Sequence, residues 1–71
     1  MNNKRLAKNI KDARLKTGIT QKALSEKIGV SLVTMQKYEE GARRPLLEGI
    51  EALAKVFGIN PISLLNGVFD D

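Results

Sequence analysis

The sequence predicts an all-α fold, a compact domain of five helices. Over most of its 71 residues, apolar side chains recur at spacings of three and four, which is the period of an amphipathic helix. Glycines fall between these stretches, at the points where helices commonly end. We find no segment with the alternating pattern of a strand, and a chain of this length forms one domain.

The first helix is expected at about residues 4–17. Leu6, Ile10 and Ala13 are spaced so that they share one face of this helix. Gly18 follows directly and suits a helix end, because glycine adopts the left-handed backbone conformation at little cost.

Two short helices are expected next, at about residues 21–28 and 32–40. Thr20 and Ser31 precede them, and a hydroxyl at this position accepts a hydrogen bond from an amide of the first turn. Gly29 lies where the earlier helix must end. The sequence therefore predicts a helix, a tight turn and a second helix.

The last two helices are expected at about residues 47–57 and 61–65. Asn60 followed by Pro61 is typical of an N-cap and a first helical residue. The domain is expected to span residues 1–66, with 67–71 as a C-terminal tail. The residues from Val68 to Asp71 are expected to fray, as chain ends commonly do.

The composition argues against an enzyme. The chain has no histidine and no cysteine, which removes the common general base, the thiolate nucleophile and the usual zinc ligands. Its eight Asp and Glu residues show no metal-ligand spacing, and no phosphate-binding loop is present. We therefore expect no catalytic residue, no cofactor, no metal and no small-molecule substrate.

Membrane association is not expected either. No segment approaches the roughly 20 consecutive apolar residues that a membrane span needs. The polar residues 1–5 are not followed by the apolar core of a signal peptide. The expected location is the cytoplasm.

The net charge of +4 is unevenly distributed along the chain. Residues 1–16 carry six positive charges and one negative charge, a net of +5, and Arg43 and Arg44 form a second, smaller cluster. Such a distribution suggests an anionic partner. A solvated helix face is the alternative for a charge run of this kind.

Two charged side chains fall on faces that are otherwise apolar. Arg14 lies four residues after Ile10, and Glu39 lies four residues after Met35. A charge directed at a core is costly unless it is paired and hydrogen-bonded, so the two side chains would meet in a bidentate ion pair. Spacing alone leaves open that each side chain extends to the surface instead.

The segment 21–38, QKALSEKIGVSLVTMQKY, matches the helix-turn-helix arrangement. With the flanking stretches IKDARLKTGITQKALSEKIGVS, TMQKYEEGARRP and LEGIEALAKVFGINPISLL, residues 6–65 resemble the lambda-type phage repressor and Cro family, also called the xenobiotic-response-element family. The resemblance implies a lambda-repressor-like domain, with the motif at its second and third helices. It also implies an ion pair between Arg14 and Glu39.

Two positions depart from the pattern of that family. Ser25 stands where alanine is usual, and it is small enough for two helices to cross closely. Leu46 stands where a capping serine is common, so the fourth helix is expected to begin less sharply.

The resemblance implies a sequence-specific regulator of transcription, most simply a repressor, whose third helix enters the major groove of double-stranded DNA. Gln36 is suited to adenine, and Lys37 to guanine or a phosphate. Leu32 and Val33 lack hydrogen-bonding groups and would contact thymine methyls, exclude wrong bases or, alternatively, pack against a protein neighbour. The expected base contacts are Ser31, Leu32, Val33, Gln36 and Lys37.

Phosphate contacts are expected at the edges of the motif. Gln21 and the free amides at the start of its helix suit a phosphate oxygen. Thr20 shares this role or is simply a cap, and the arginines after the third helix either contact phosphates or lie in a solvated loop. The expected phosphate contacts are Thr20, Gln21, Thr34, Arg43 and Arg44.

One module of this size covers half of an operator, so we expect a homodimer, at least on DNA, bound to a pseudo-palindrome. By family analogy the dimer surface includes the fifth helix; Val68 and Phe69 either contribute to it or form a free tail. The chain is either a complete small regulator or the DNA-binding part of a longer one. The alternative function is a protein-interaction module, such as an antitoxin-like domain that docks a partner protein.

Overall fold

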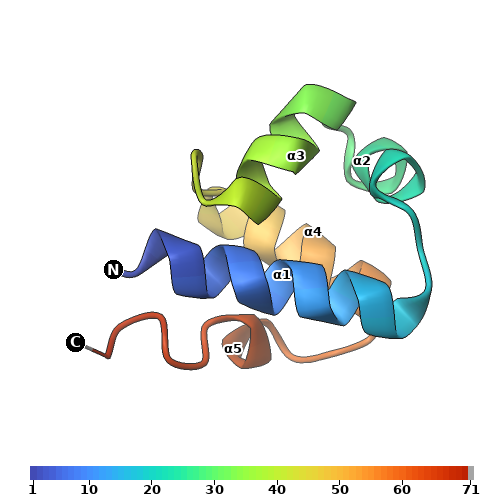
Figure 1. Ribbon diagram of the computed structural model, residues 1–71. Helices are drawn as coiled ribbons and strands as arrows, with labels where there is room; N and C mark the ends of the chain where they lie inside the picture. Colours follow the sequence, from blue (N-terminus) through green and yellow to red (C-terminus); the bar gives the residue numbers. More distant parts are fainter. Residues whose placement is uncertain (71) are drawn as a thin grey trace.

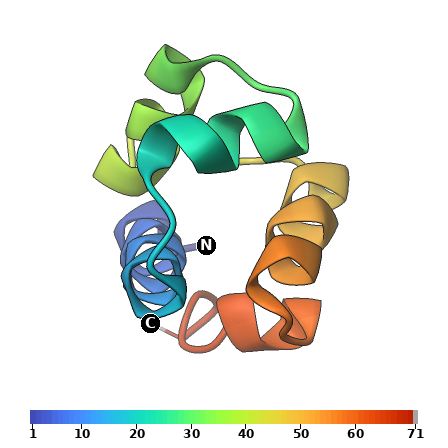
Figure 2. The ribbon, with the colours of Figure 1, turned by 90° about the vertical axis from the view of Figure 1, so that its right-hand side faces the viewer.

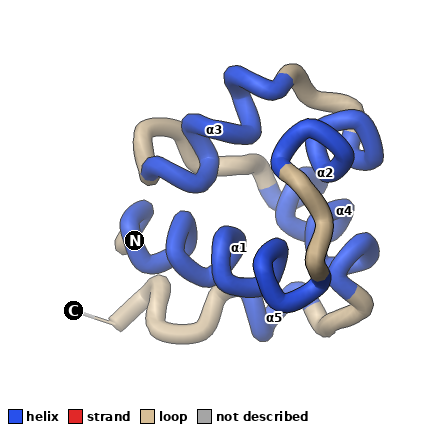
Figure 3. The backbone as a smooth tube through the Cα atoms, turned by 45° about the vertical axis from the view of Figure 1, so that its right-hand side comes forward, coloured by secondary structure: helices blue, strands red, loops and turns tan. Residues whose placement is uncertain are grey.

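The computed structural model describes residues 1–70 as five α-helices joined by short loops, and this part of the chain contains no strand (Figure 3). The five-helix all-α prediction is confirmed, and each helix lies within one residue of its expected bounds. The helices are α1 (Asn3–Thr17), α2 (Gln21–Ile28), α3 (Leu32–Glu40), α4 (Leu47–Phe57) and α5 (Pro61–Leu64).

The helices form two layers in a body of 32 × 24 × 20 Å (Figures 1 and 2). The paired helices α2 and α3 lie together on one side, and α1 and α5 lie on the other, with α4 alongside. The first turn of α3 lies at the outer edge of the molecule, on the side away from α1 and α5 (Figure 1). The motif is thus carried on a scaffold made by the other three helices.

One apolar core joins all five helices. Burial of such side chains drives folding, because each buried methylene stabilises the folded state by about 0.8 kcal/mol. The largest fully buried side chains of this core are Leu6, Ile10, Leu24, Met35, Leu53, Leu64 and Val68.

Val68 corrects one expectation from the sequence. It is 0% exposed, and its carbonyl accepts a hydrogen bond of 2.7 Å from the amide of Asn2, so it is not frayed. Gly67 makes this possible, because its φ of +76° turns the chain back towards α1. Phe69, in contrast, is 67% exposed, and Asp71 lies outside the described residues.

Polar side chains of α1 hold the segment that follows α5. The Asn9 side-chain amide donates to the carbonyls of Leu64 (2.9 Å) and Asn66 (2.8 Å), and Arg5 Nε donates to Asn66 (3.3 Å). These bonds satisfy carbonyl groups that no helix uses. They hold the segment after α5 along α1 (Figures 1 and 3).

The helix starts follow the predicted capping. Thr20 and Asn60 each accept a hydrogen bond from an amide of the following first turn, as predicted, and Asn2 does the same for α1, where no cap was predicted. The N-cap residue of α4 is Leu46, whose apolar side chain accepts no hydrogen bond from the first turn, in line with the departure noted in the sequence. None of the helices within residues 1–70 combines the length and the apolar character required to cross a membrane.

Candidate nucleic-acid interface

A tight turn sets the angle between α2 and α3. Gly29 has a φ of +75° and ends α2, and the amide of Val30 donates to the carbonyl of Ser25 at 3.0 Å. Ser25 is 2% exposed, and its hydroxyl donates to the carbonyl of Lys22 in its own helix at 2.7 Å. Serine therefore fits at this crossing without leaving a buried hydroxyl unpaired.

The predicted ion pair between Arg14 and Glu39 is present and bidentate. Arg14 Nε donates to Glu39 Oε2 at 2.6 Å, and Arg14 Nη2 donates to Oε1 at 3.0 Å. The side chains are only 12% and 2% exposed, so the charges are withdrawn from solvent. Arg14 Nη1 also donates to the carbonyl of Ile19 at 3.1 Å, which fixes the loop between α1 and α2.

Gln21 joins this buried network. Its side-chain amide donates to Glu39 Oε1 at 3.1 Å, so Glu39 links α1, the start of α2 and the end of α3. Sequence reasoning missed this bond, because nothing in the spacing of two residues so far apart indicates it. The bond uses one of the two amide hydrogens and holds the side chain at the first turn of α2.

The hydroxyls at the start of α3 are bonded to each other. Ser31 Oγ accepts from the amide of Thr34 at 3.1 Å and donates to Thr34 Oγ1 at 3.0 Å. At the start of α2, the Thr20 hydroxyl likewise accepts a hydrogen bond from a first-turn amide, that of Ala23, at 3.1 Å. Capping is therefore observed at both helix starts.

The outward face of α3 combines apolar and polar side chains. Leu32 is 39% exposed and Val33 is 58% exposed. Gln36 is half-buried and Lys37 is exposed, one turn further along. Helix α3 therefore presents these four side chains on its solvent side, while Met35 and Tyr38 point into the core.

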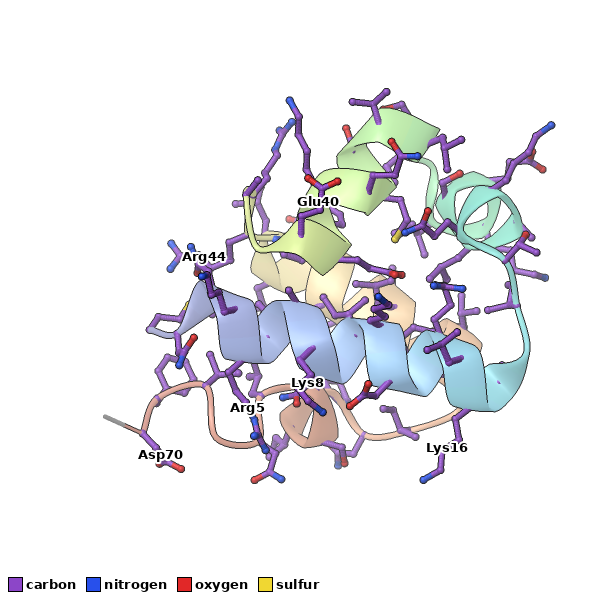
Figure 4. All side chains as sticks on the ribbon, in the orientation of Figure 1. Arg5, Lys8, Lys16, Glu40, Arg44 and Asp70 are labelled. Atoms are coloured by element: carbon purple, nitrogen blue, oxygen red, sulfur yellow. The ribbon has the colours of Figure 1, made fainter. Side chains whose placement is uncertain are left out.

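The loop after α3 carries the two expected arginines. The amides of Ala42 and Arg43 donate to the carbonyl of Lys37 at 3.1 and 3.3 Å, which folds the loop back onto the end of α3. Both Arg43 and Arg44 are exposed. Arg44 Nη1 lies 2.8 Å from Met1 Sδ, next to the start of α1 (Figure 4).

Some of the positive side chains of α1 point away from α3. Figure 4 shows Arg5 and Lys16 pointing from α1 to the side opposite α3. Lys8 forms an exposed ion pair with Asp12 at 2.7 Å within the same helix. Lys4, in contrast, lies beside Gly41 at the end of α3, so the charge excess of residues 1–16 is divided between the two sides of α1. Within residues 1–70, no group of three or more acidic side chains is placed to hold a metal ion.

The comparison with known sequences agrees with this geometry. A helix-turn-helix family profile matches residues 10–64. The chain is 39% identical over 56 residues to the transcriptional repressor RstR of the cryptic phage CTXphi of Vibrio cholerae. That alignment includes 79% of this chain, and the chain spans about half the length of this relative.

Three solved structures share the fold. The DNA-binding domain of the phage P22 C2 repressor is 34% identical, with a TM-score of 0.84 over 94% of this chain and 88% of that domain. The gene regulator ClgR of Corynebacterium glutamicum is 20% identical, with a TM-score of 0.86 over 90% of this chain and 68% of its own. The restriction-modification controller protein C.AhdI of Aeromonas hydrophila is 24% identical, with a TM-score of 0.81 over 86% of this chain and 92% of its own. The last two likenesses show the fold alone.

Proposed function

Because the chain belongs to the helix-turn-helix family of the phage repressor and Cro type, we propose that it is a sequence-specific DNA-binding regulator of transcription, most simply a repressor. The observation that carries this proposal is the outward face of α3. This face lies at the edge of the molecule (Figure 1). On the opposite, inward side, the pair of Arg14 and Glu39 connects α3 to α1, and two exposed arginines follow the helix.

In this proposal α3 enters the major groove and its first residues reach the base edges. Gln36 hydrogen-bonds adenine, and Lys37 reaches guanine acceptors or a phosphate. Ser31 lies at the start of the helix, where it positions the first turn against the bases.

Phosphate contacts surround the base contacts. The first-turn amides of α2 and the remaining hydrogen of the Gln21 amide suit one phosphate, with Thr20 and Thr34 at the helix starts beside it. Arg43 and Arg44 suit phosphates beyond the end of α3. These contacts fix the position on the duplex but carry no sequence information.

A second copy of the chain would bind the other half-site of the operator. An exposed apolar surface lies at the start of α4, on α5 and at the end of the described chain. Phe69 lines two hollows on it, one of about 250 Å³ beside Leu46 and Leu47 and one of about 560 Å³ beside Ile62. These four side chains are 65–79% exposed. A ridge between two hollows suits the self-complementary contact of a two-fold dimer.

The proposal includes no enzymatic activity and places the protein in the cytoplasm, where a bacterial or phage operator is found. Family membership supports both statements, since one matching relative is named as a transcriptional repressor and another as the DNA-binding domain of a repressor.

Fluorescence anisotropy with a labelled duplex of random sequence tests the proposal. At low salt we expect binding, and the logarithm of the association constant should fall steeply and linearly with the logarithm of salt concentration. The absence of binding at low salt would contradict the proposal. It would favour the protein-interaction module, in which Leu32 and Val33 dock a partner protein.

A further inference from the structure

We propose that the peptide bond between Asn66 and Gly67 is a site of spontaneous covalent modification, at which Asn66 loses its side-chain amide and is converted to isoaspartate. The conversion adds a methylene to the main chain and releases the buried Val68, and with it the segment after α5, from the core. This inference goes beyond the proposed function and does not depend on it, because it rests on the chemistry and the contacts of this one peptide bond.

Among the five asparagines of the chain, only Asn66 is followed by glycine. A side-chain amide can form a ring with the next backbone nitrogen only if that nitrogen comes close, and a side chain on the next residue obstructs the approach. Glycine carries no side chain and leaves the backbone the most freedom to rotate. The residues after the other four asparagines are Asn3, Lys4, Ile10 and Pro61, and proline has no N–H to lose.

Both reacting groups are open in the structure. The Asn66 side chain is exposed, between two hollows of about 610 and 560 Å³ that it lines. Among residues 1–70, the hydrogen bonds at Asn66 involve only its backbone, and the Gly67 amide has no acceptor. The side-chain amide and the nitrogen that attacks it are therefore both available.

The other asparagines are held in place. The side chains of Asn2 and Asn60 accept hydrogen bonds from first-turn amides, and the Asn9 side-chain amide donates to two carbonyls of the segment after α5. Asn3 is the first residue of α1, where the helical backbone fixes the position of the next nitrogen. The structure thus favours reaction at Asn66 over all of them.

The reaction begins with attack of the Gly67 nitrogen on the side-chain carbon Cγ of Asn66. A bond forms between these two atoms, the proton of the nitrogen passes to a base in the solvent, and the C–N bond of the side-chain amide breaks. The amide nitrogen takes up a proton from water and leaves as ammonia, and a cyclic imide remains. Water then opens the ring at either carbonyl, which gives aspartate or isoaspartate. The net change is one water gained and one ammonia lost, with no oxidant or reductant.

The added methylene falls where the segment after α5 is anchored. The Asn66 carbonyl accepts from Arg5 Nε at 3.3 Å and from the Asn9 amide at 2.8 Å, and this fixes the turn that buries Val68. In isoaspartate this carbonyl becomes part of a free carboxylate, and the main chain runs through the former side-chain carbon instead. There is little room to adjust, because a Cβ on Gly67 would lie 2.9 Å from Arg5 Nε.

The test incubates the purified chain in mildly alkaline buffer at physiological temperature. Peptide mapping, with a fragmentation method that distinguishes isoaspartate from aspartate, follows each asparagine. We expect loss of the amide at Asn66, with isoaspartate among the products, while the other four asparagines remain intact. The isoaspartate fraction, separated by chromatography, should melt at least about 8 °C below the fresh protein, because Val68 leaves the core.

Variants assign the effect to the main chain at this position. Asn66→Gln should keep its melting temperature through the same incubation, because its longer side chain closes a ring far more slowly. Asn66→Asp is the other product of ring opening with an unaltered main chain, and it should melt within about 3 °C of the fresh protein. Asn3→Gln is the matched control, since Asn3 is also exposed, and it should age as the unaltered chain does.

Two results would overturn the inference. One is an Asn66 that is still intact after prolonged incubation, or that is converted no faster than Asn3. The other is an isoaspartate fraction that melts with the fresh protein, because the burial of Val68 would then not depend on the main chain at Asn66. Neither result bears on DNA binding, which the anisotropy titration tests separately.

Discussion

Glu39 connects three parts of the protein through one carboxylate. It accepts two hydrogen bonds from Arg14 and one from Gln21, and its side chain is 2% exposed. The position of both charges on apolar faces suggested the pair with Arg14 but left it open, and the family resemblance implied it. The sequence could not indicate the bond from Gln21 to Glu39. The Gln21 amide can donate to a protein carboxylate or to a DNA phosphate, and which acceptor lies within reach depends on the folded positions of the side chains.

Removing Glu39 should cost much more stability than removing a surface carboxylate. Glu39→Ala leaves Arg14 buried without its partner, so we expect a loss of about 3 kcal/mol in the free energy of unfolding. Thermal melting measures the effect, and Glu26→Ala, an exposed position on α2, is the control. A melting shift for Glu39→Ala no larger than that of the control would contradict a stabilising role for the pair.

At the scale of elements, α3 and the loop that follows it have different roles in the proposed interface. The side chains of α3 face the groove and carry base preference, whereas the loop arginines carry charge. Their placement followed from the sequence, because helical spacing defines the outward face of α3 and Gly41 ends the helix before the arginines.

Lys37→Ala and Arg43→Ala should therefore weaken binding in different ways. Lys37→Ala should reduce affinity and change the preferred base at its position. Arg43→Ala should weaken all sequences alike and lower the salt slope by about one unit, because it removes one phosphate contact. A salt slope unchanged by Arg43→Ala in an anisotropy titration would refute its phosphate role.

The segment after α5 is the element that the sequence described least well. A short apolar stretch after the last helix carries no periodicity, and only the turn at Gly67 brings Val68 into the core. A side chain at Gly67 would also place its Cβ 2.9 Å from Arg5 Nε. The burial of Val68 thus depends on contacts with α1 that local sequence does not encode.

Val68→Ala should lower the free energy of unfolding by about 2 kcal/mol, because it removes two methylene-sized groups from a fully buried site. Val33→Ala makes the same chemical change at a site that is 58% exposed and should cost less than about 0.5 kcal/mol. Urea denaturation of both variants measures the difference. Equal losses would show that the C-terminal segment does not contribute to the core in solution.

At the scale of the whole molecule, the net charge of +4 has a more specific meaning than its size suggests. Arg14 is neutralised inside the protein, and Arg5 and Lys16 of α1 point away from α3 (Figure 4). In the proposed interface, the cations that contact DNA are Lys37, Arg43 and Arg44. A count of charges along the sequence could not separate these groups, because it does not show towards which side of the molecule each side chain points.

The proposed dimer gives a prediction of its own. Phe69→Ala removes the exposed ring between the two hollows, so we expect about a tenfold loss of affinity for a duplex with two half-sites. Affinity for a single half-site should remain as it is. Leu15→Ala, on the exposed face of α1, is the control, and an equal loss on both duplexes would contradict a role of Phe69 in the dimer.

Selection of preferred duplexes from a random pool tests the central claim, sequence-specific binding by a two-fold pair of α3 helices, most directly. We predict an enriched pseudo-palindrome whose half-sites lie one helical turn, about 34–36 Å, apart or a multiple of that distance. A pool that shows no enriched sequence after repeated rounds would contradict the claim.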